Sequence, residues 1–146
     1  MSDRAPRILI VEDETLIALE LESLLQDEGY EAVGIAASRA EAASLAQDLR
    51  AQAQPPDLAL VDIHLADGAT GIEVARGLVD DGVRVVFLSA NTKRLPADMV
   101  GACGAIAKPY TERVVRSAIR YVLEDGAGET PDCFERAPNW PATLAA

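Results

Sequence analysis

The chain has 146 residues, of which 49% are hydrophobic and 25% are charged, a balance that suits one globular domain with its own core. It carries 13 Lys and Arg residues against 24 Asp and Glu residues, and the net charge of −11 argues against binding to a nucleic-acid backbone. Cys103 and Cys133 lack the spacing of a metal knuckle, and no segment suits a signal peptide or a membrane span. We therefore expect a cytoplasmic protein that meets neither membrane nor nucleic acid.

The first half of the chain alternates short apolar runs with helix-like segments. The expected elements are a strand at 8–11, a helix at 14–28, a weak strand at 31–36 and an Ala-rich helix to about residue 52. The first apolar run is uninterrupted, which is typical of a strand buried on both faces. Gly29 suits the end of the first helix, and the Ser38 and Glu41 pair is a capping-box pattern at the start of the second.

The second half continues the alternation to residue 125. The expected elements are a strand at 58–61, a helix at 71–80, a strand at 83–88, a short helix through Val100, a strand at 104–107 and a helix at 111–125. Strands that alternate with helices five times predict an α/β fold, a doubly wound five-stranded parallel sheet with helices on both faces.

Residues 126–146 follow this domain of residues 1–125 and differ from it in composition. They are rich in Pro, Gly and Ala and show no hydrophobic periodicity, so we expect a flexible C-terminal tail. Phe134 and Trp140 leave open the alternative that the tail docks on its own domain or on a partner.

Polar side chains follow four of the predicted strands. The first strand ends on Glu12 and Asp13, and the third ends on Asp62. Ser89 follows the fourth strand and Lys108 follows the fifth. Because ligands of open parallel sheets bind at the carboxyl ends of the strands, we expect these five side chains to converge on one edge.

This combination of side chains predicts a Mg²⁺ site. Hard oxygen ligands suit Mg²⁺, which would offset the repulsion among the acids and leave one carboxylate free as a nucleophile. A phosphoryl group on that carboxylate would meet Mg²⁺, the Lys108 ammonium and a hydrogen bond from Ser89. Simpler interpretations exist for single residues: Asp13 as a helix cap, Lys108 as a solvated lysine and Ser89 as a turn residue.

Four segments, IVEDE, LVDIHL, FLSA and AKPY, resemble the receiver domain of bacterial two-component response regulators over about residues 6–125. The resemblance implies a flavodoxin-like fold in which Asp62 accepts a phosphoryl group from the phosphohistidine of a sensor kinase. It implies that Asp13, Asp62 and the backbone carbonyl of His64 bind Mg²⁺, with Glu12 acting mostly through water.

Further residues take their roles from the same resemblance. Ser89 and Lys108 match the hydroxyl and lysine that read the phosphoryl group, and Pro109 matches a proline usually preceded by a cis peptide bond. His64 and Asn91 hold positions that flank the phosphoryl group and tune its hydrolysis, with simple loop exposure as the alternative.

The chain departs from the family at its fourth helix. The family often has an aromatic residue three positions before its lysine, where this chain has Ala105. The segment from Ser89 to Lys108 is also shorter than usual, by about one helical turn. We therefore expect a short or mobile fourth helix with few buried contacts.

Two helical faces are candidate partner surfaces. Leu16 and Leu19 of the first helix point away from its apolar stripe. Receivers commonly dock kinases with their first helix, so we expect Leu16 and Leu19 to form a docking site. Scattered surface leucines are the alternative. Arg113, Arg116 and Arg120 form a basic stripe on the last helix, either a solvated face or a partner surface.

The sequence as a whole predicts a stand-alone receiver that catalyses only its own phosphotransfer and slow dephosphorylation. Its expected partners are a sensor histidine kinase and a downstream protein or histidine phosphotransfer protein, so it would signal by protein contact or serve as a phosphate shuttle or sink. One alternative is a Mg²⁺-dependent phosphohydrolase with Asp62 as nucleophile, disfavoured because His64 stands where such enzymes have a second acid. The other is a receiver-like scaffold that is never phosphorylated.

Overall fold

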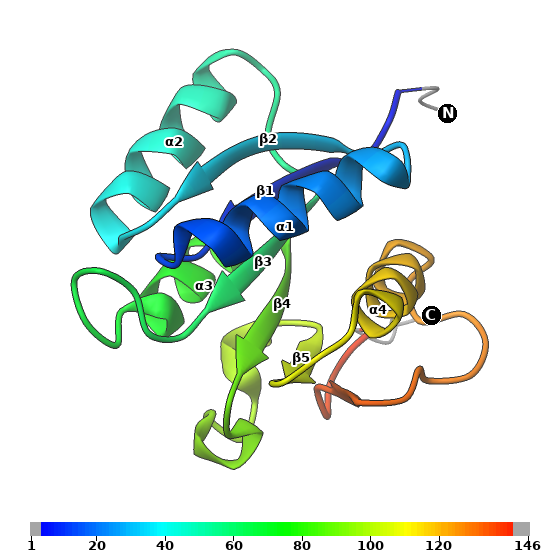
Figure 1. The fold of residues 1–146 in the computed structure, drawn as a ribbon. Coiled ribbons are helices and arrows are strands. Elements are labelled where there is room, and N and C mark those ends of the chain that lie inside the picture. The colour runs from blue at the N-terminus through cyan, green and yellow to red at the C-terminus, as the bar shows by residue number, and fades with distance from the viewer. Residues whose placement is uncertain (1–3, 142–146) are drawn as a thin grey trace, which may run out of the picture.

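The computed structural model describes residues 4–141. Its elements are β1 (Arg7–Val11), α1 (Thr15–Asp27), β2 (Glu31–Ala36), α2 (Arg39–Ala51), β3 (Leu58–Asp62), α3 (Gly71–Asp80), β4 (Arg84–Ser89), the 3₁₀ turns η1 (Thr92–Arg94) and η2 (Met99–Gly101), β5 (Gly104–Ala107), α4 (Glu112–Leu123) and β6 (Phe134–Arg136). The strands form one sheet in the order β2-β1-β3-β4-β5-β6 (Figure 1). The first five are parallel, which confirms the predicted doubly wound α/β fold, and β6 is antiparallel to β5.

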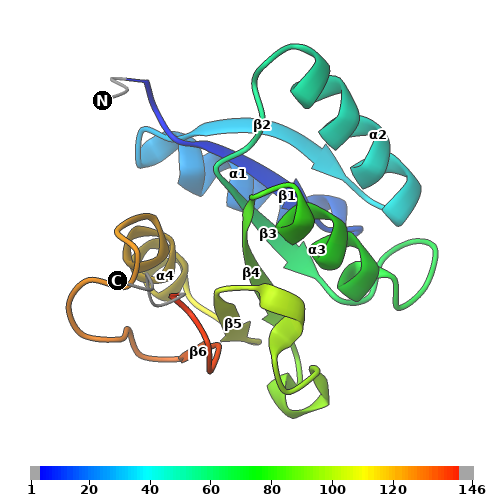
Figure 2. The same cartoon turned by 180° about the vertical axis from the view of Figure 1, so that it is seen from behind.

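Helices cover both faces of the sheet. Ile8 and Ile10 of β1 pack with α1 and α4, whereas Leu9 and Val11 pack toward α2 and α3 (Figures 1 and 2). Successive side chains of a strand point to opposite faces, so a strand between two helical layers needs apolar residues at every position. This explains the unbroken apolar runs of β1, β3 and β4. None of the helices within residues 4–141 combines the length and the apolar character needed to cross a membrane.

The predicted capping box at the start of α2 is present. Ser38 Oγ accepts a hydrogen bond from Glu41 N at 3.1 Å, and Glu41 Oε1 accepts one from Ala37 N at 3.0 Å. The glutamate thus reaches the residue before the cap, and the pair satisfies two backbone donors that the helix itself leaves free.

The short helix expected through Val100 is replaced by the two 3₁₀ turns. Pro96 lies between them and has no backbone N–H to donate. The side chains of Asn91 and Asp98 accept hydrogen bonds from backbone N–H groups two residues later, at 3.0 Å in both cases. Such local bonds compete with helical ones, so a segment already short for the family does not complete a helix.

The flexible tail expected for residues 126–146 differs from what the structure shows. Its described part folds back onto its own domain, where Phe134 lies opposite Ile106 in the pairing of β6 with β5. Phe134 is 6% exposed, and Trp140 packs against both hydrophobic layers. Burial of the Phe134 ring and partial burial of the Trp140 ring offset the weak hydrophobic pattern of the surrounding residues, so the docked alternative holds here. Residues 142–146 lie outside the described part.

Candidate functional site

Three acidic side chains meet at the carboxyl edge of the sheet. Glu12 and Asp13 follow β1, and Asp62 ends the neighbouring strand β3, where Val11 pairs with Val61. Carboxylate oxygens of the three residues lie within 4.8 Å of one another. Glu12 and Asp62 are buried, at 1% and 6% exposure, while Asp13 is exposed. The predicted acidic cluster is therefore formed by the fold.

Lys108 supplies positive charge to this cluster. Its Nζ lies 2.5 Å from Asp62 Oδ2 and 3.8 Å from Glu12 Oε1. Strand β4 lies between β3 and β5, so the Lys108 side chain reaches across the end of β4 to Asp62. The backbone N of Lys108 donates a hydrogen bond to Ser89 O at 2.8 Å. The Lys108–Pro109 bond is cis, as predicted. One ammonium among three carboxylates leaves the site with excess negative charge.

Glu12 is held in unfavourable surroundings for an anion. Its Oε2 accepts a hydrogen bond from Glu14 N at 3.1 Å, but Oε1 has no hydrogen-bond partner among the described residues. The pKa of Glu12 is raised to about 7, chiefly by burial and also by Asp62, while the N–H of Glu14 and the charge of Lys108 act in the opposite direction. A buried carboxylate with an unbonded oxygen is the arrangement that a bound cation would stabilise.

The donor set suits Mg²⁺. All three acids offer hard oxygen atoms within reach of one ion, and the exposed position of Asp13 leaves room for water ligands. His64 N donates to Asp62 Oδ1 at 3.1 Å, and the imidazole is on an exposed residue. His64 is thus adjacent to the cluster through its backbone, and the role of its carbonyl as a metal ligand stays a prediction.

Ser89 is the last residue of β4, and Asn91 follows it by two residues at the same edge of the sheet. Ser89 is buried, and its Oγ accepts a hydrogen bond from Asn91 N at 3.1 Å. The side chain of Asn91 is exposed and accepts from Lys93 N, which caps η1. Ser89 thus directly follows Leu88, the residue that pairs with Asp62 across the sheet, whereas the Asn91 amide oxygen is engaged in its own turn.

Gly71 fixes the other wall of the site. Its N donates to Ile63 O at 2.9 Å, and a Cβ at this position would collide with the backbone of Asp62 and Ile63. Helix α3 thus begins directly against the strand end that carries Asp62, which only glycine permits. The position of Gly71, nine residues beyond Asp62, is the signal for this contact in the sequence.

Tyr110 is a neighbour of the site that sequence reasoning did not single out. It lines a cavity of about 470 Å³ together with Lys108 and three apolar residues of α1, Ile17, Leu21 and Leu24. Burial raises the pKa of Tyr110 to about 12, and the charges of Glu12 and Asp62 add to the effect. Its place directly after the Lys-Pro pair was the only available signal.

The two candidate partner surfaces differ in the structure. Leu16 and Leu19 are 70% and 49% exposed, as expected, and their docking role stays a prediction. On α4, Arg116 and Arg120 both reach Glu28 at the end of α1, at 3.7 and 3.6 Å. Two residues of the basic stripe thus tie two helices together within the chain.

Comparison with known proteins agrees with this geometry. Residues 8–120 match the response regulator receiver domain family. The phyllosphere-induced regulator PhyR of Methylorubrum extorquens is 36% identical over 124 residues, which cover 84% of this chain and 45% of that protein. The transcriptional regulatory protein PdtaR of Mycobacterium tuberculosis is 34% identical over 109 residues, 72% of this chain and 50% of that protein.

A solved structure shows the same likeness. The receiver domain of Erythrobacter litoralis PhyR superimposes with a TM-score of 0.73 at 32% identity, covering 87% of this chain and 96% of that domain. The chain spans about half the length of the curated relatives it matches. The strand-end acids and the lysine lie within residues 8–120, which match the receiver family. The chain belongs to the response regulator receiver domain family of two-component signalling.

Proposed function

We propose that Asp62 accepts a phosphoryl group from the phosphohistidine of a sensor histidine kinase in a Mg²⁺-dependent reaction. The observation that carries this proposal is the contact of Lys108 Nζ with the buried Asp62 carboxylate, inside a cluster with excess negative charge. A buried carboxylate beside a cation is suited to attack phosphorus and then to hold the product.

The transfer balances as a displacement at phosphorus. A carboxylate oxygen of Asp62 attacks, the P–N bond to the donor imidazole breaks, and the electron pair returns to the imidazole nitrogen, which takes up a proton. The Lys108 ammonium beside Asp62 and the Ser89 hydroxyl at the end of the neighbouring strand would bind phosphoryl oxygens. Mg²⁺ held by Asp13, Asp62 and the His64 carbonyl, with Glu12 acting through water, would neutralise charge on the transferred group.

The test is Mg²⁺-dependent labelling with a small-molecule phosphodonor, followed by mapping of the acyl phosphate. We expect Asp62→Asn to abolish labelling, while Asp48→Asn, at an exposed acid on α2, leaves it unchanged. Labelling that persists in Asp62→Asn, or that fails with every donor and kinase, contradicts the proposal. Turnover of a generic phosphomonoester would favour the phosphohydrolase alternative instead.

We also propose that His64 and Asn91 set the lifetime of the phosphoryl group. His64 follows Asp62 by two residues and bonds to it through its backbone, and Asn91 bonds to Ser89 in the same way. Replacing either side chain leaves these two backbone contacts in place, although the Asn91 side chain also accepts a hydrogen bond from Lys93 N. His64→Ala or Asn91→Ala should alter the dephosphorylation rate several-fold, and an unchanged rate in both variants would reject this role.

The kinase is proposed to dock on α1, beside the site. Leu16 and Leu19 are exposed apolar residues near the start of this helix, directly after the acids of β1. Leu16→Glu should slow phosphotransfer from the kinase and spare labelling by a small-molecule donor. Ser23→Glu, at an exposed position farther along α1, adds the same charge as a control. Equal loss in both assays would mean that Leu16 acts on the site and not on docking.

Output is proposed to pass by protein contact, either to a downstream protein or to a histidine phosphotransfer protein. The charge of −11 disfavours a direct role on nucleic acid. Phosphorylation would act by shifting the balance between two arrangements of the segments around Ser89 and Lys108.

A further inference from the structure

The segment of residues 130–140, here called the strap, covers the open edge of the sheet. Without it, β5 would be the last strand and would present unpaired backbone groups. In the strap, Ala137 N donates to Cys103 O at 2.9 Å, and β6 pairs with Gly104–Ile106. The strap lies beyond residue 120, where the match to the receiver family ends.

Aromatic contacts hold the strap in place. The rings of Phe134 and Trp140 both stand edge-on to Tyr121 of α4, with centroid distances of 5.6 and 5.9 Å. Gly104 of β5 makes room for the Phe134 ring, because a Cβ there would collide with that ring and with Glu135 O. A strand of three residues adds few hydrogen bonds, so these rings carry most of the docking.

The strap touches both segments that lead to the acidic cluster, and both contacts are long. Ala107 N lies 3.5 Å from Cys133 O, and Ala107 directly precedes Lys108. Thr92 Oγ1 lies 3.4 Å from Glu135 Oε1, and Thr92 is next to Asn91. Hydrogen bonds of this length are weak, so small movements of either segment can break them.

A continuous set of contacts connects these segments to Asp62. Ser89 Oγ now accepts from Asn91 N. A phosphoryl group on Asp62 would offer the Ser89 hydroxyl a charged acceptor, and a turn of Ser89 toward it would remove the acceptor of Asn91 N. The loop that carries Thr92 would then follow Ser89 toward the site and away from Glu135.

We propose that the strap is an intramolecular cover of the β5 edge, and that phosphorylation of Asp62 weakens its docking. The proposal rests on the function proposed above. Release of the strap would expose the unpaired edge of β5 and the Tyr121 ring, a surface suited to an added strand that carries an aromatic residue. Phosphorylation of Asp62 would thereby control access to the edge of β5 that the strap covers.

The first test compares amide hydrogen exchange with and without Mg²⁺ and beryllium fluoride, which imitates an acyl phosphate on a carboxylate. We expect exchange at Ala137 N to accelerate at least about fivefold, a coupling of the usual size between two sites. Glu31 N, bonded to Pro6 O at 2.9 Å at the far edge of the sheet, should keep its rate. Trp140, the only tryptophan, should change its fluorescence in parallel.

The second test uses reciprocity, because a ligand that loosens the strap must bind better when the strap is already loose. Phe134→Ala should tighten beryllium fluoride binding by the same factor by which the ligand speeds exchange. Leu49→Ala, a change at a buried residue of α2, should lower stability without this gain. If Phe134→Ala does not fold, Thr92→Val should still bind beryllium fluoride but lose the response at Ala137.

The outcomes separate the two proposals. Modified Asp62 with unchanged exchange at Ala137 and unchanged affinity in Phe134→Ala overturns the strap proposal alone. Failure of both beryllium fluoride and a phosphodonor to modify Asp62 overturns the proposed function, and the strap proposal falls with it.

Discussion

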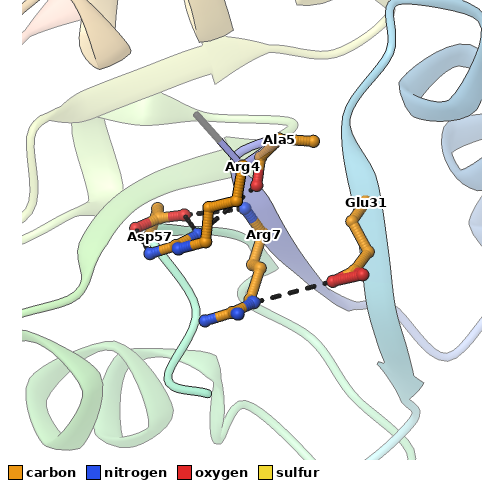
Figure 3. Close-up of polar contacts among 5 residues, drawn as sticks. All are labelled: Arg4, Ala5, Arg7, Glu31 and Asp57. Atoms are coloured by element: carbon orange, nitrogen blue, oxygen red, sulfur yellow. Dashed lines mark hydrogen bonds and ion pairs between the residues drawn. The ribbon is translucent and has the colours of Figure 1, made fainter. Parts of the chain in front are cut away.

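The two edges of the sheet treat charge in opposite ways. At the amino edge, Asp57 precedes β3 and accepts hydrogen bonds from Arg4 Nη1 and Nη2 at 2.8 and 3.0 Å and from Arg7 N at 2.7 Å (Figure 3). Arg7 Nε in turn lies 3.6 Å from Glu31 on β2. Each acid in this group faces an arginine, and the group connects the beginnings of three neighbouring strands.

The carboxyl edge is unbalanced by comparison. Glu12, Asp13 and Asp62 share Lys108, and Glu12 Oε1 has no hydrogen bond among the described residues. Buried charge that is not fully paired lowers stability, so this edge costs the fold free energy that the amino edge does not. Acids that each face an arginine hold strands together here, while acids that outnumber the nearby positive charge mark the place for a cation and a phosphoryl group.

Removal of the Lys108 ammonium from the carboxyl edge should have the largest effect. Lys108→Met keeps the length of the side chain and removes its charge, leaving Asp62 and Glu12 without the ammonium. We expect phosphotransfer to Asp62 to slow by about 10²–10³-fold, the usual cost of losing one charge-stabilising group. Initial rates with a small-molecule donor measure this directly.

The matched control for this change is the other lysine of the chain. Lys93 is exposed on η1, and Lys93→Met removes the same charge without touching the ion pairs of Lys108 with Asp62 and Glu12. Equal rates in the two variants would show that net charge matters and that the contact with Asp62 does not.

A substitution at the amino edge should change the stability of the protein and leave its phosphotransfer rate unchanged. Asp57→Asn removes a charged acceptor from Arg4 and Arg7, and because the side chain is partly exposed we expect a loss of about 1–2 kcal/mol in the free energy of unfolding. Urea unfolding measures the loss, and phosphotransfer of the folded variant should match the wild-type rate. A slowed reaction would show that the two edges are coupled.

Mg²⁺ should act only on the carboxyl edge. A ligand that binds the folded state alone stabilises it by about 1.4 kcal/mol at ten times its dissociation constant. We expect thermal unfolding to shift upward with Mg²⁺ in the wild type and in Asp57→Asn, and to lose the shift in Asp13→Asn. A shift of full size in Asp13→Asn would place the ion elsewhere.

The carboxyl edge could be predicted from the sequence because its information is local. Each strand is an unbroken apolar run, and the polar residue after it marks where the run ends, as Asp62 does after β3. The parallel topology then brings those ends together without any knowledge of distant contacts. Glu12, Asp13, Ser89 and Lys108 follow from the same rule.

The rest could not be predicted because it depends on contacts between distant residues. Asp57 meets Arg4 across 53 positions, and neither residue has a local pattern that points to the other. Strand β6 has three residues and forms only against the edge of β5. The strap similarly depends on Tyr121, whose partners Phe134 and Trp140 lie in a segment with the composition of a flexible tail.

The smallest expected effect is the pH dependence of the amino edge. Burial tends to raise the pKa of Asp57, but hydrogen bonds from Arg4 and Arg7 N and the charges of the two arginines outweigh it and lower the pKa below the usual value. A lowered pKa in the folded state means that the stabilisation is complete above the unfolded value of about 3.9. It is lost as the pH falls through the lower, folded value.

The measurement is the difference in unfolding free energy between the wild type and Asp57→Asn at several pH values. Other acids contribute equally to both proteins and cancel in this difference. We expect it to be constant above about pH 5 and to shrink below about pH 4, as protons bind to Asp57 in the unfolded chain first. If this difference in unfolding free energy stays constant down to the pH at which the protein unfolds, Asp57 stabilises the fold through the geometry of its hydrogen bonds and not through its charge. The contrast in charge between the two edges would then rest on the carboxyl edge alone.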